Sequence, residues 1–482
     1  MLFSSLRAVG FTLVLAGTLA AQTPPKLSAG VRAFVKVDAE TTALRHVRVI
    51  DGTGAPAREN QTLVFSGGKI TALGDDSTTS VPANATVLDL AGSTVIPGIV
   101  GMHEHMYYPT PGGGLPMYGE HATSFPRLYL AGGVTTMRTT GSVEPYTDLE
   151  LKRKIDEGTL AGPSMRITGP YLEGEGAFAP QMHQLRDAED ARRMVEFWMD
   201  AGATSFKAYM NMTPEELAAV VKAAHARGAK VTGHLGAIGF REAAAIGIDN
   251  LEHGLVVDTE FFSGKKPGVC PNTQAAAREM AEKLDVASAP VQAMIQDLVA
   301  RKVAVTSTLP VFETFVPGRA PTDARILDAM TPQAKESYLK TRESIAAGAD
   351  KSYWPALFAK ELQFEREFVK AGGLLLAGLD PTGYGGVIPG FGDQREIELL
   401  VEAGFTPVEA IQIATSNGAR FLGELEHIGT LAVGKEADIV VLHGDPSTNI
   451  ADIEKVELVF KDGVGFDSAK LIESVRGLVG LR

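Results

Sequence analysis

The chain has 482 residues, of which 45% are hydrophobic and 21% are charged, a composition typical of a globular protein with room for one large domain and a smaller companion. Its formal net charge is −13 and it has no run of basic residues, which argues against binding nucleic acid or anionic membranes. Cys270 is the single cysteine, so an intramolecular disulfide and a thiolate metal cage are both excluded. We therefore expect a small-molecule ligand, and any bound metal must use nitrogen and oxygen ligands.

Residues 1–21 have the pattern of a cleavable signal peptide. Arg7 precedes an apolar stretch over residues 8–20, which ends in small residues at Ala20 and Ala21. The stretch falls short of the roughly 20 residues needed to cross a bilayer, which disfavours an uncleaved anchor. No later stretch is long and apolar enough to span a membrane. We expect export to the periplasm or the medium, and a mature chain with no integral membrane span.

The two ends of the mature chain share a β-rich pattern. After a lead segment at residues 22–41 with little regular structure, residues 42–95 contain short β-rich runs separated by Gly and Asp, as in HVRVIDGTG and QTLVFSGGKITALG. A similar pattern returns over residues 426–482 in HIGTLAVGKEADIVVLHGDP and VELVFKDG. We predict that both ends pair into one small β-sandwich.

Between these ends, residues 96–425 alternate short apolar runs with helical patterns. This β-α alternation predicts a parallel sheet, and eight strand candidates suggest a closed TIM-like (β/α)8 barrel, an α/β fold. Residues 263–300 and 312–371 are longer than a single crossover needs, so we expect helical excursions near the barrel mouth that form a lid. The strand candidates are STVIPGIVGMH, GVTTMRTT, MRITGPYL, ATSFKAYM, KVTGHL, NLEHGL, VAVTSTLP and GGLLLAGLD.

Residues of metal-ligand type occur at the ends of five of these strands. His103 and His105 are two positions apart on one strand, so their imidazoles should face the same way. TIM barrels gather their chemistry at the carboxyl ends of the strands, where all these side chains would converge. Chance histidines, with a lysine that merely neutralises a buried acid, are the simpler alternative but explain five strand ends poorly. The other strand-end candidates are Lys207, His234, His253 and Asp380.

In these motifs, and in the ending GTLAVGKEADIVVL, the chain resembles the amidohydrolase superfamily, in the binuclear subtype with a carboxylated lysine. The resemblance implies two divalent ions, of which zinc is the expected metal. It implies that His103 and His105 bind one ion, that His234 and His253 bind the other, and that Lys207 bridges both as a carbamate. Asp380 would bind the first ion and act on the bridging water.

The chemistry of such a site follows from charge. A lysine carbamate offers two oxygens and a negative charge that can span two cations. Two divalent ions lower the pKa of the water between them and polarise the scissile carbonyl. Asp380 can then move a proton from that water to the leaving amine, as a general acid and base.

Three further residues are candidates for substrate contact. Tyr209 lies two positions after Lys207, so it should face the site; donation to a developing oxyanion and plain core packing are equally good interpretations. His183 in AFAPQMHQL can reach substrate or lie solvated in a loop, and Arg138 can face the pocket or form a structural ion pair. The role of His121 is open, and structural or surface roles are expected for His46, His225, His427 and His443.

The spacing of Lys207, His234 and His253 is most similar to the branch that contains imidazolonepropionase-related enzymes and Xaa-Pro or acyl-amino-acid dipeptidases. Imidazolonepropionases lack the bridging lysine, which favours the dipeptidase-like group. We therefore predict hydrolysis of a small amide, a dipeptide or an N-acyl amino acid. Two alternatives stay open. One is a cyclic amidase, hydantoinase-like, or a lactonase, and the other is a non-catalytic, metal-stabilised protein that is exported to bind a small ligand. The sequence does not decide whether the chain forms a homo-oligomer.

Overall fold

The computed structural model describes residues 26–110 and 116–481. The predicted signal peptide, residues 1–21, lies outside the described residues. In the described part of the chain, no helix combines the length and the apolar character needed to cross a membrane.

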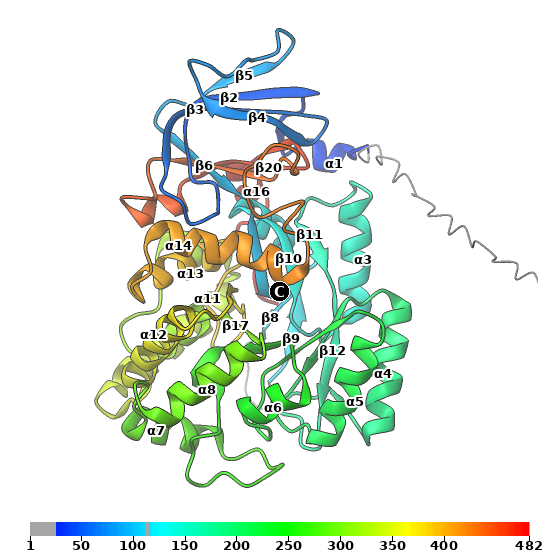
Figure 1. Ribbon diagram of the computed structural model, residues 1–482, viewed down its shortest axis with the longest axis vertical. Helices are drawn as coiled ribbons and strands as arrows, with labels where there is room; N and C mark the ends of the chain where they lie inside the picture. The colour runs from blue at the N-terminus through cyan, green and yellow to red at the C-terminus, as the bar shows by residue number, and fades with distance from the viewer. Residues whose placement is uncertain (1–25, 111–115, 482) are drawn as a thin grey trace, which may run out of the picture.

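The two ends of the chain form one mixed sheet of nine strands in the order β1-β21-β20-β19-β6-β2-β3-β4, with β5 also paired to β2. These strands lie together at one end of the molecule (Figure 1). The antiparallel pair of β6 and β19 joins the N-terminal strands to the C-terminal ones. The bounds are β1 Val35–Val37, β2 Thr41–Val49, β3 Arg58–Ser66, β4 Lys69–Asp75, β5 Thr86–Asp89, β6 Ser93–Pro97, β19 Ile439–His443, β20 Val456–Lys461 and β21 Val464–Asp467.

This sheet differs from the predicted sandwich because it is hydrogen-bonded throughout. It curls so that its halves enclose a core: the rings of Phe65 on β3 and Phe460 on β20 lie 5.0 Å apart although three strands, β19, β6 and β2, lie between them in the sheet. The prediction of little regular structure at residues 22–41 was wrong. The short helix α1 (Ala29–Arg32) lies there, followed by β1, whose edge position was hidden because its partner β21 is more than 400 residues away.

The middle of the chain forms two parallel sheets, in the orders β11-β10-β7 and β13-β12-β14-β15-β16-β17-β18. Each predicted strand run contains at least one observed strand, and nearly all of their residues are buried, as expected for sheets covered on both faces. The bounds are β7 Ile99–Glu104, β10 Val134–Thr139, β11 Ser164–Arg166, β12 Thr168–Glu173, β13 His183–Gln184, β14 Ser205–Ala208, β15 Lys230–Gly233, β16 Asn250–Glu252, β17 Ala304–Ser307 and β18 Leu375–Ala377. A separate hairpin consists of β8 Tyr107–Pro109 and β9 Tyr118–Glu120.

Two seams separate the parallel sheets, and isolated contacts cross both. At one seam, Thr168 N donates to Thr139 Oγ1 at 2.9 Å, next to the start of β12. At the other, Asp380 N donates to the carbonyl oxygen of His103 at 3.1 Å, which holds the end of β18 against β7. The strand ladders in the described residues do not close into a ring, but the contact across the second seam brings two candidate ligands together.

Helices surround the parallel sheets, and the excursions at residues 263–300 and 312–371 are indeed largely helical (Figure 1). The α-helices outside the excursions that follow α1 are α2 Ser124–Ala131, α3 Pro145–Asp156, α4 Ala188–Ala201, α5 Pro214–His225, α6 Phe240–Ile246, α13 Phe391–Glu402, α14 Pro407–Gln412, α15 Gly418–Leu422 and α16 Ser468–Glu473. Those that begin within or beside the excursions are α7 Thr273–Lys283, α8 Ala289–Ala300, α9 Leu309–Glu313, α10 Ala324–Ala329, α11 Pro332–Ala347 and α12 Trp354–Lys370.

Candidate metal centre

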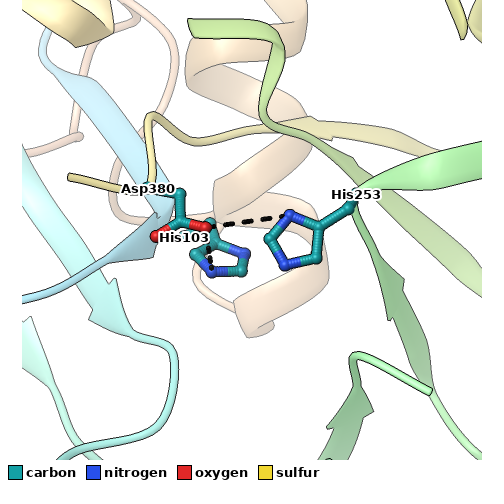
Figure 2. Close-up of side chains that lie close together, drawn as sticks. All are labelled: His103, His253 and Asp380. Carbon is teal, nitrogen blue, oxygen red and sulfur yellow. Dashed lines mark ion pairs between the residues drawn. The ribbon is translucent and has the colours of Figure 1, made fainter. Parts of the chain in front are cut away.

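Three side chains from distant strands meet at the carboxyl ends of the parallel strands. His103 comes from β7, His253 follows β16 and Asp380 follows β18. One Asp380 oxygen, Oδ2, lies 3.7 Å from His103 Nε2 and 3.9 Å from His253 Nδ1 (Figure 2). The three ligand atoms lie within 4.8 Å of one another, and all three residues are buried. This spacing fits side chains that share one cation.

The other three predicted ligands adjoin this group. His105 Nε2 lies 3.5 Å from Asp380 Oδ1, the carboxylate oxygen that does not face His103. Lys207 Nζ lies 3.2 Å from His103 Nε2, and the ring of His234 lies 4.6 Å from that of His253. The structure therefore brings together all six residues, from five strand ends.

Hydrogen bonds fix which imidazole nitrogens face the centre of the group. His103 Nδ1 pairs with Glu252 Oε2 at 2.7 Å, and His105 Nδ1 pairs with the carbonyl oxygen of Gly141 at 3.1 Å. In both rings Nε2 is the atom turned toward Asp380. Metal-binding histidines are commonly oriented in this way, by a carboxylate or a carbonyl on the other nitrogen. On His253, Nδ1 also contacts Thr308 Oγ1, at 2.8 Å.

Two of the candidate ligands have backbone conformations unusual for side-chain-bearing residues. His253 has φ 69° and Asp380 has φ 51°. Strict alternation along β16 would place His253 on the face opposite Glu252, whereas the left-handed turn lets both side chains point into the site. Such strain persists only where the surroundings hold it, and it clusters at functional sites.

Burial sets the protonation of the group. It lowers the pKa of His103, His105 and His253 well below the usual value and that of His234 to about 3, so all four rings are neutral near pH 7. Burial also lowers the pKa of Lys207 to about 8 and raises that of Asp380 to about 6. Neutral imidazoles and a carboxylate are what a divalent cation binds, so the donor set fits zinc or a similar ion.

Four of the six residues, Lys207, His234, His253 and Asp380, line a cavity of about 520 Å³. His103 and His105 lie next to Asp380, outside that lining. Tyrosines line one side of it, with Phe178 and Met182, while helices α7, α9 and α12 of the excursions contribute to the other side. The excursions thus border the mouth, as the lid prediction supposed. The lining tyrosines on the first side are Tyr107, Tyr118, Tyr171 and Tyr209.

Of the three residues predicted to contact substrate, one lines the cavity and two do not. Tyr209 lines the cavity, with its ring 4.8 Å from that of His234. Arg138 does not line it, so the prediction of a substrate contact is corrected: the guanidinium is buried between strands, where Nη2 donates to Glu252 at 2.7 Å and Nη1 to Asn250 at 2.9 Å. His183 also lies away from the cavity, with Nε2 3.6 Å from a carboxylate oxygen of Asp190. A buried cation needs a carboxylate partner, which explains the place of Arg138.

The structure also assigns residues that the sequence reasoning left without a role. Glu252 precedes His253 in the NLEHG motif and orients His103. The sequence offered one signal for this role, the position of Glu252 next to a candidate ligand. Tyr171 OH lies 3.4 Å from His105 Nε2 and contacts Tyr107 OH. His121 lies beside β9, where its Nε2 accepts a hydrogen bond of 2.6 Å from Gly480 N. That bond joins the C-terminal segment to the cavity hairpin.

Comparisons with known proteins give a family. The model of the amidohydrolase family matches residues 94–304 and 367–464, more than half of the chain. Enamidase of Eubacterium barkeri is 27% identical over 41% of this chain and 50% of its own length, so the match spans about half of that relative. An imidazolonepropionase of Mycolicibacterium smegmatis is 25% identical over 80% of this chain and 85% of its own.

Solved structures agree at the level of the fold. A Xaa-Pro dipeptidase with bound methionine superposes with a TM-score of 0.66, at 21% identity, over 89% of this chain and all of that one. At this identity the likeness speaks for the fold alone, a TIM-like barrel with an additional domain. It agrees with the α/β arrangement of the parallel sheets beside the nine-stranded sheet. Together with the family match, it confirms the resemblance stated from the sequence: the chain belongs to the amidohydrolase family, a family of metal-dependent hydrolases.

Proposed function

We propose that this protein hydrolyses an amide bond of small substrates, dipeptides or N-acyl amino acids, with two divalent metal ions, zinc by preference. The ions are held by His103, His105, His234 and His253 together with Asp380 and a carbamate on Lys207. The observation that carries the proposal is the convergence of these six side chains from five strand ends, with four of them lining one cavity. The family match supports metal-dependent amide hydrolysis as the class of reaction.

When bound, the ions supply an activated water and polarise the substrate carbonyl. Asp380 is the proton carrier, because its two oxygens face His103 and His105 and its side chain lines the cavity. It takes the proton of the attacking water and delivers it to the leaving nitrogen. Tyr209 lies on the cavity wall with its phenol available to the carbonyl oxygen.

Lys207 is suited to carboxylation. Its amine is buried, and its pKa of about 8 leaves an appreciable neutral fraction at neutral pH. The neutral amine attacks the carbon of CO2, a C–N bond forms, and the nitrogen gives up a proton to solvent. A carbamate on Lys207 would offer two oxygens and a negative charge beside His103, whose Nε2 now lies 3.2 Å from Nζ. It would replace an ammonium, which would repel the ions.

The test is the metal content of purified wild-type protein and of Lys207→Ala, measured by mass spectrometry. We expect about two ions per chain in the wild type and a sharp loss in the variant, because the bridge is gone. Lys230→Ala is the matched control: its ammonium lies over the ring of Phe421, in an exposed position outside the cavity lining. Equal metal content in both variants would refute the bridging role.

Turnover separates an enzyme from a binding protein. The metal-loaded wild type should hydrolyse members of a panel of amides, cyclic amides and lactones, and Asp380→Asn should lower kcat by at least a hundredfold with its fold intact. Tight binding without turnover on the whole panel would favour the non-catalytic alternative, whereas preference for the cyclic members would favour the hydantoinase-like or lactonase alternative.

We also propose that the two parallel sheets act as one (β/α)8 barrel and that the protein is exported. The contacts across both seams support the first proposal. The apolar pattern of residues 8–20 after Arg7 supports the second. Cell fractionation with N-terminal sequencing tests export: we expect a periplasmic or secreted chain that starts near Gln22, and an intact N-terminus in the cytosol would refute it.

A further inference from the structure

The side of the cavity formed by the helical excursions is lined with stacked aromatic rings. We call Phe312, Phe315, Tyr353, Trp354 and Tyr384 the aromatic wall. The rings of Phe315 and Trp354 stack at 4.6 Å with an interplanar angle of 17°, and those of Tyr353 and Trp354 stack at 5.4 Å. Phe312 closes the inner end, with its ring 5.6 Å from that of His253. The wall therefore begins beside the metal centre.

The aromatic wall is tied to the loop that carries Asp380. Tyr384, on that loop, packs edge-on against Phe315 with ring centroids 4.9 Å apart. Gly383 has φ +61°, and a Cβ there would lie 2.9 Å from Val311 and 3.4 Å from Phe315. The loop thus lies directly against the wall, which places the wall beside Asp380.

The cavity offers little to a negatively charged group away from the metals. Among the described lining residues there is no arginine, and Lys207 is the one lysine, already placed at the metal centre. The lining carboxylates are Asp258 and Asp380. Arg278 lies nearby, but its guanidinium stacks on the ring of Tyr353, 4.9 Å from the centroid, and it does not line the cavity.

We propose that the substrate places an uncharged aromatic group against the aromatic wall and carries no free carboxylate on that group. The inference rests on the proposed function and narrows it to dipeptides, N-acyl amino acids or arylamides whose aromatic group is uncharged. Stacked rings favour a flat apolar group. A carboxylate buried there would lose its hydration without gaining a cationic partner.

Binding is measured first, because it needs no turnover. The chain has two tryptophans, Trp198 and Trp354. Trp198 lies on α4 against Tyr146, so Trp198→Phe leaves Trp354 as the sole tryptophan reporter on the wall. The probes are 4-acetamidobenzamide and 4-acetamidobenzoate, which share the ring and the scissile anilide bond, whose cleavage releases acetate, and differ in charge. With the metal-loaded protein, we expect the carboxamide to quench Trp354 with a Kd at least tenfold lower.

Turnover of the same pair is the second readout. We expect kcat/KM to favour the carboxamide at least tenfold, and Trp354→Ala to lower kcat/KM for it at least tenfold while the metal content stays at the wild-type value. Trp354→Phe, which keeps a flat ring, should recover most of that loss. Recovery by Phe separates stacking from a general loss of fold.

Three outcomes decide the matter. Equal or tighter binding of the carboxylate overturns the inference, and if Arg278→Ala then abolishes that binding, the guanidinium is the missing cation. Quenching by the carboxamide without hydrolysis of either probe or of the wider amide panel supports the wall as a binding site while it refutes the proposed amide hydrolysis. Hydrolysis of both probes at equal rates supports the reaction and overturns the neutral preference.

Discussion

Glu252→Gln tests how far the metal centre depends on a charge beneath it. Glu252 is fully buried, and its two oxygens face different partners: Oε1 accepts from Arg138 Nη2 at 2.7 Å and also from Thr232, while Oε2 pairs with His103 Nδ1 at 2.7 Å. Glutamine keeps the shape but leaves the buried guanidinium without a counter-charge. Breaking a buried pair in this way costs about 3–5 kcal/mol, and loss of a ligand's orienting partner weakens metal binding about 10- to 100-fold.

The loss of stability and the loss of metal affinity can be separated, because they depend on different oxygens of Glu252. Urea unfolding of the metal-free protein, followed by circular dichroism, should show Glu252→Gln less stable by at least about 3 kcal/mol. Adding Arg138→Met removes the unpaired cation and should recover most of this stability, yet zinc affinity, measured against a competing chelator, should stay low because His103 is still disoriented.

The matched control is Glu189→Gln, whose exposed pair with Arg192 should contribute less than about 1 kcal/mol. If Glu252→Gln unfolds no earlier than this control, or if Arg138→Met in the Glu252→Gln background restores zinc affinity, the described role of Glu252 is wrong.

Three further predictions concern groups around the site. Burial raises the pKa of Glu365 to about 8, so the folded chain holds the carboxyl proton more tightly than the unfolded chain does. The protonated carboxyl contributes its full stability below about pH 4.5, and this contribution is lost as pH rises through 8. Glu365→Gln should therefore flatten the fall in Tm between about pH 5 and 9. Gly254→Ala should lower the free energy of unfolding in urea by roughly 2 kcal/mol or more, because φ is +61° and the added Cβ would lie 1.8 Å from Glu361 Oε1. The control Gly228→Ala, with φ +73° and open space around the Cβ, should cost only about 1–2 kcal/mol of backbone strain. Equal costs would count against the close contact. His121→Ala removes the acceptor of Gly480 N and should speed carboxypeptidase digestion of the C-terminal segment relative to the exposed-histidine control His443→Ala, and unchanged digestion would contradict the tether.

The sequence predicted the residues of the site better than the shape of the fold around it. Strand ends are local features, because an apolar run that stops at Lys207 or at His234 can be recognised within a few residues. In a parallel barrel the carboxyl ends of the strands meet at one face, so these residues are brought together. The continuous nine-stranded sheet was not visible, because its pairings join segments as distant as β1 and β21. Period-two patterns identify strands but do not say whether two groups of strands share one sheet.

Arg138 shows where a local pattern misleads. It lies on a buried strand in GVTTMRTT, and a cation on a barrel strand is equally consistent with a pocket or with the barrel interior. The choice is made by Glu252, more than 100 residues later, which gives the guanidinium a carboxylate partner below the site. In a regular strand Glu252 and His253 would lie on opposite faces, so NLEHG alone does not show that both act at the site.

The left-handed conformation of His253 lets both residues act at the site. It also explains how one short strand, β16, can supply both a residue that orients a ligand and a candidate ligand. Glu252, the last residue of β16, contacts His103 and Arg138. The next residue, His253, has a left-handed conformation, and its ring packs against that of Phe312 at the cavity. Asp380, with φ 51°, makes a similar departure just before the loop that meets the aromatic wall. The two strained residues therefore mark the points at which the parallel sheets give way to the loops and helices that line the cavity. Changes beyond those points should alter which amide is accepted while the geometry of the metal ligands stays fixed.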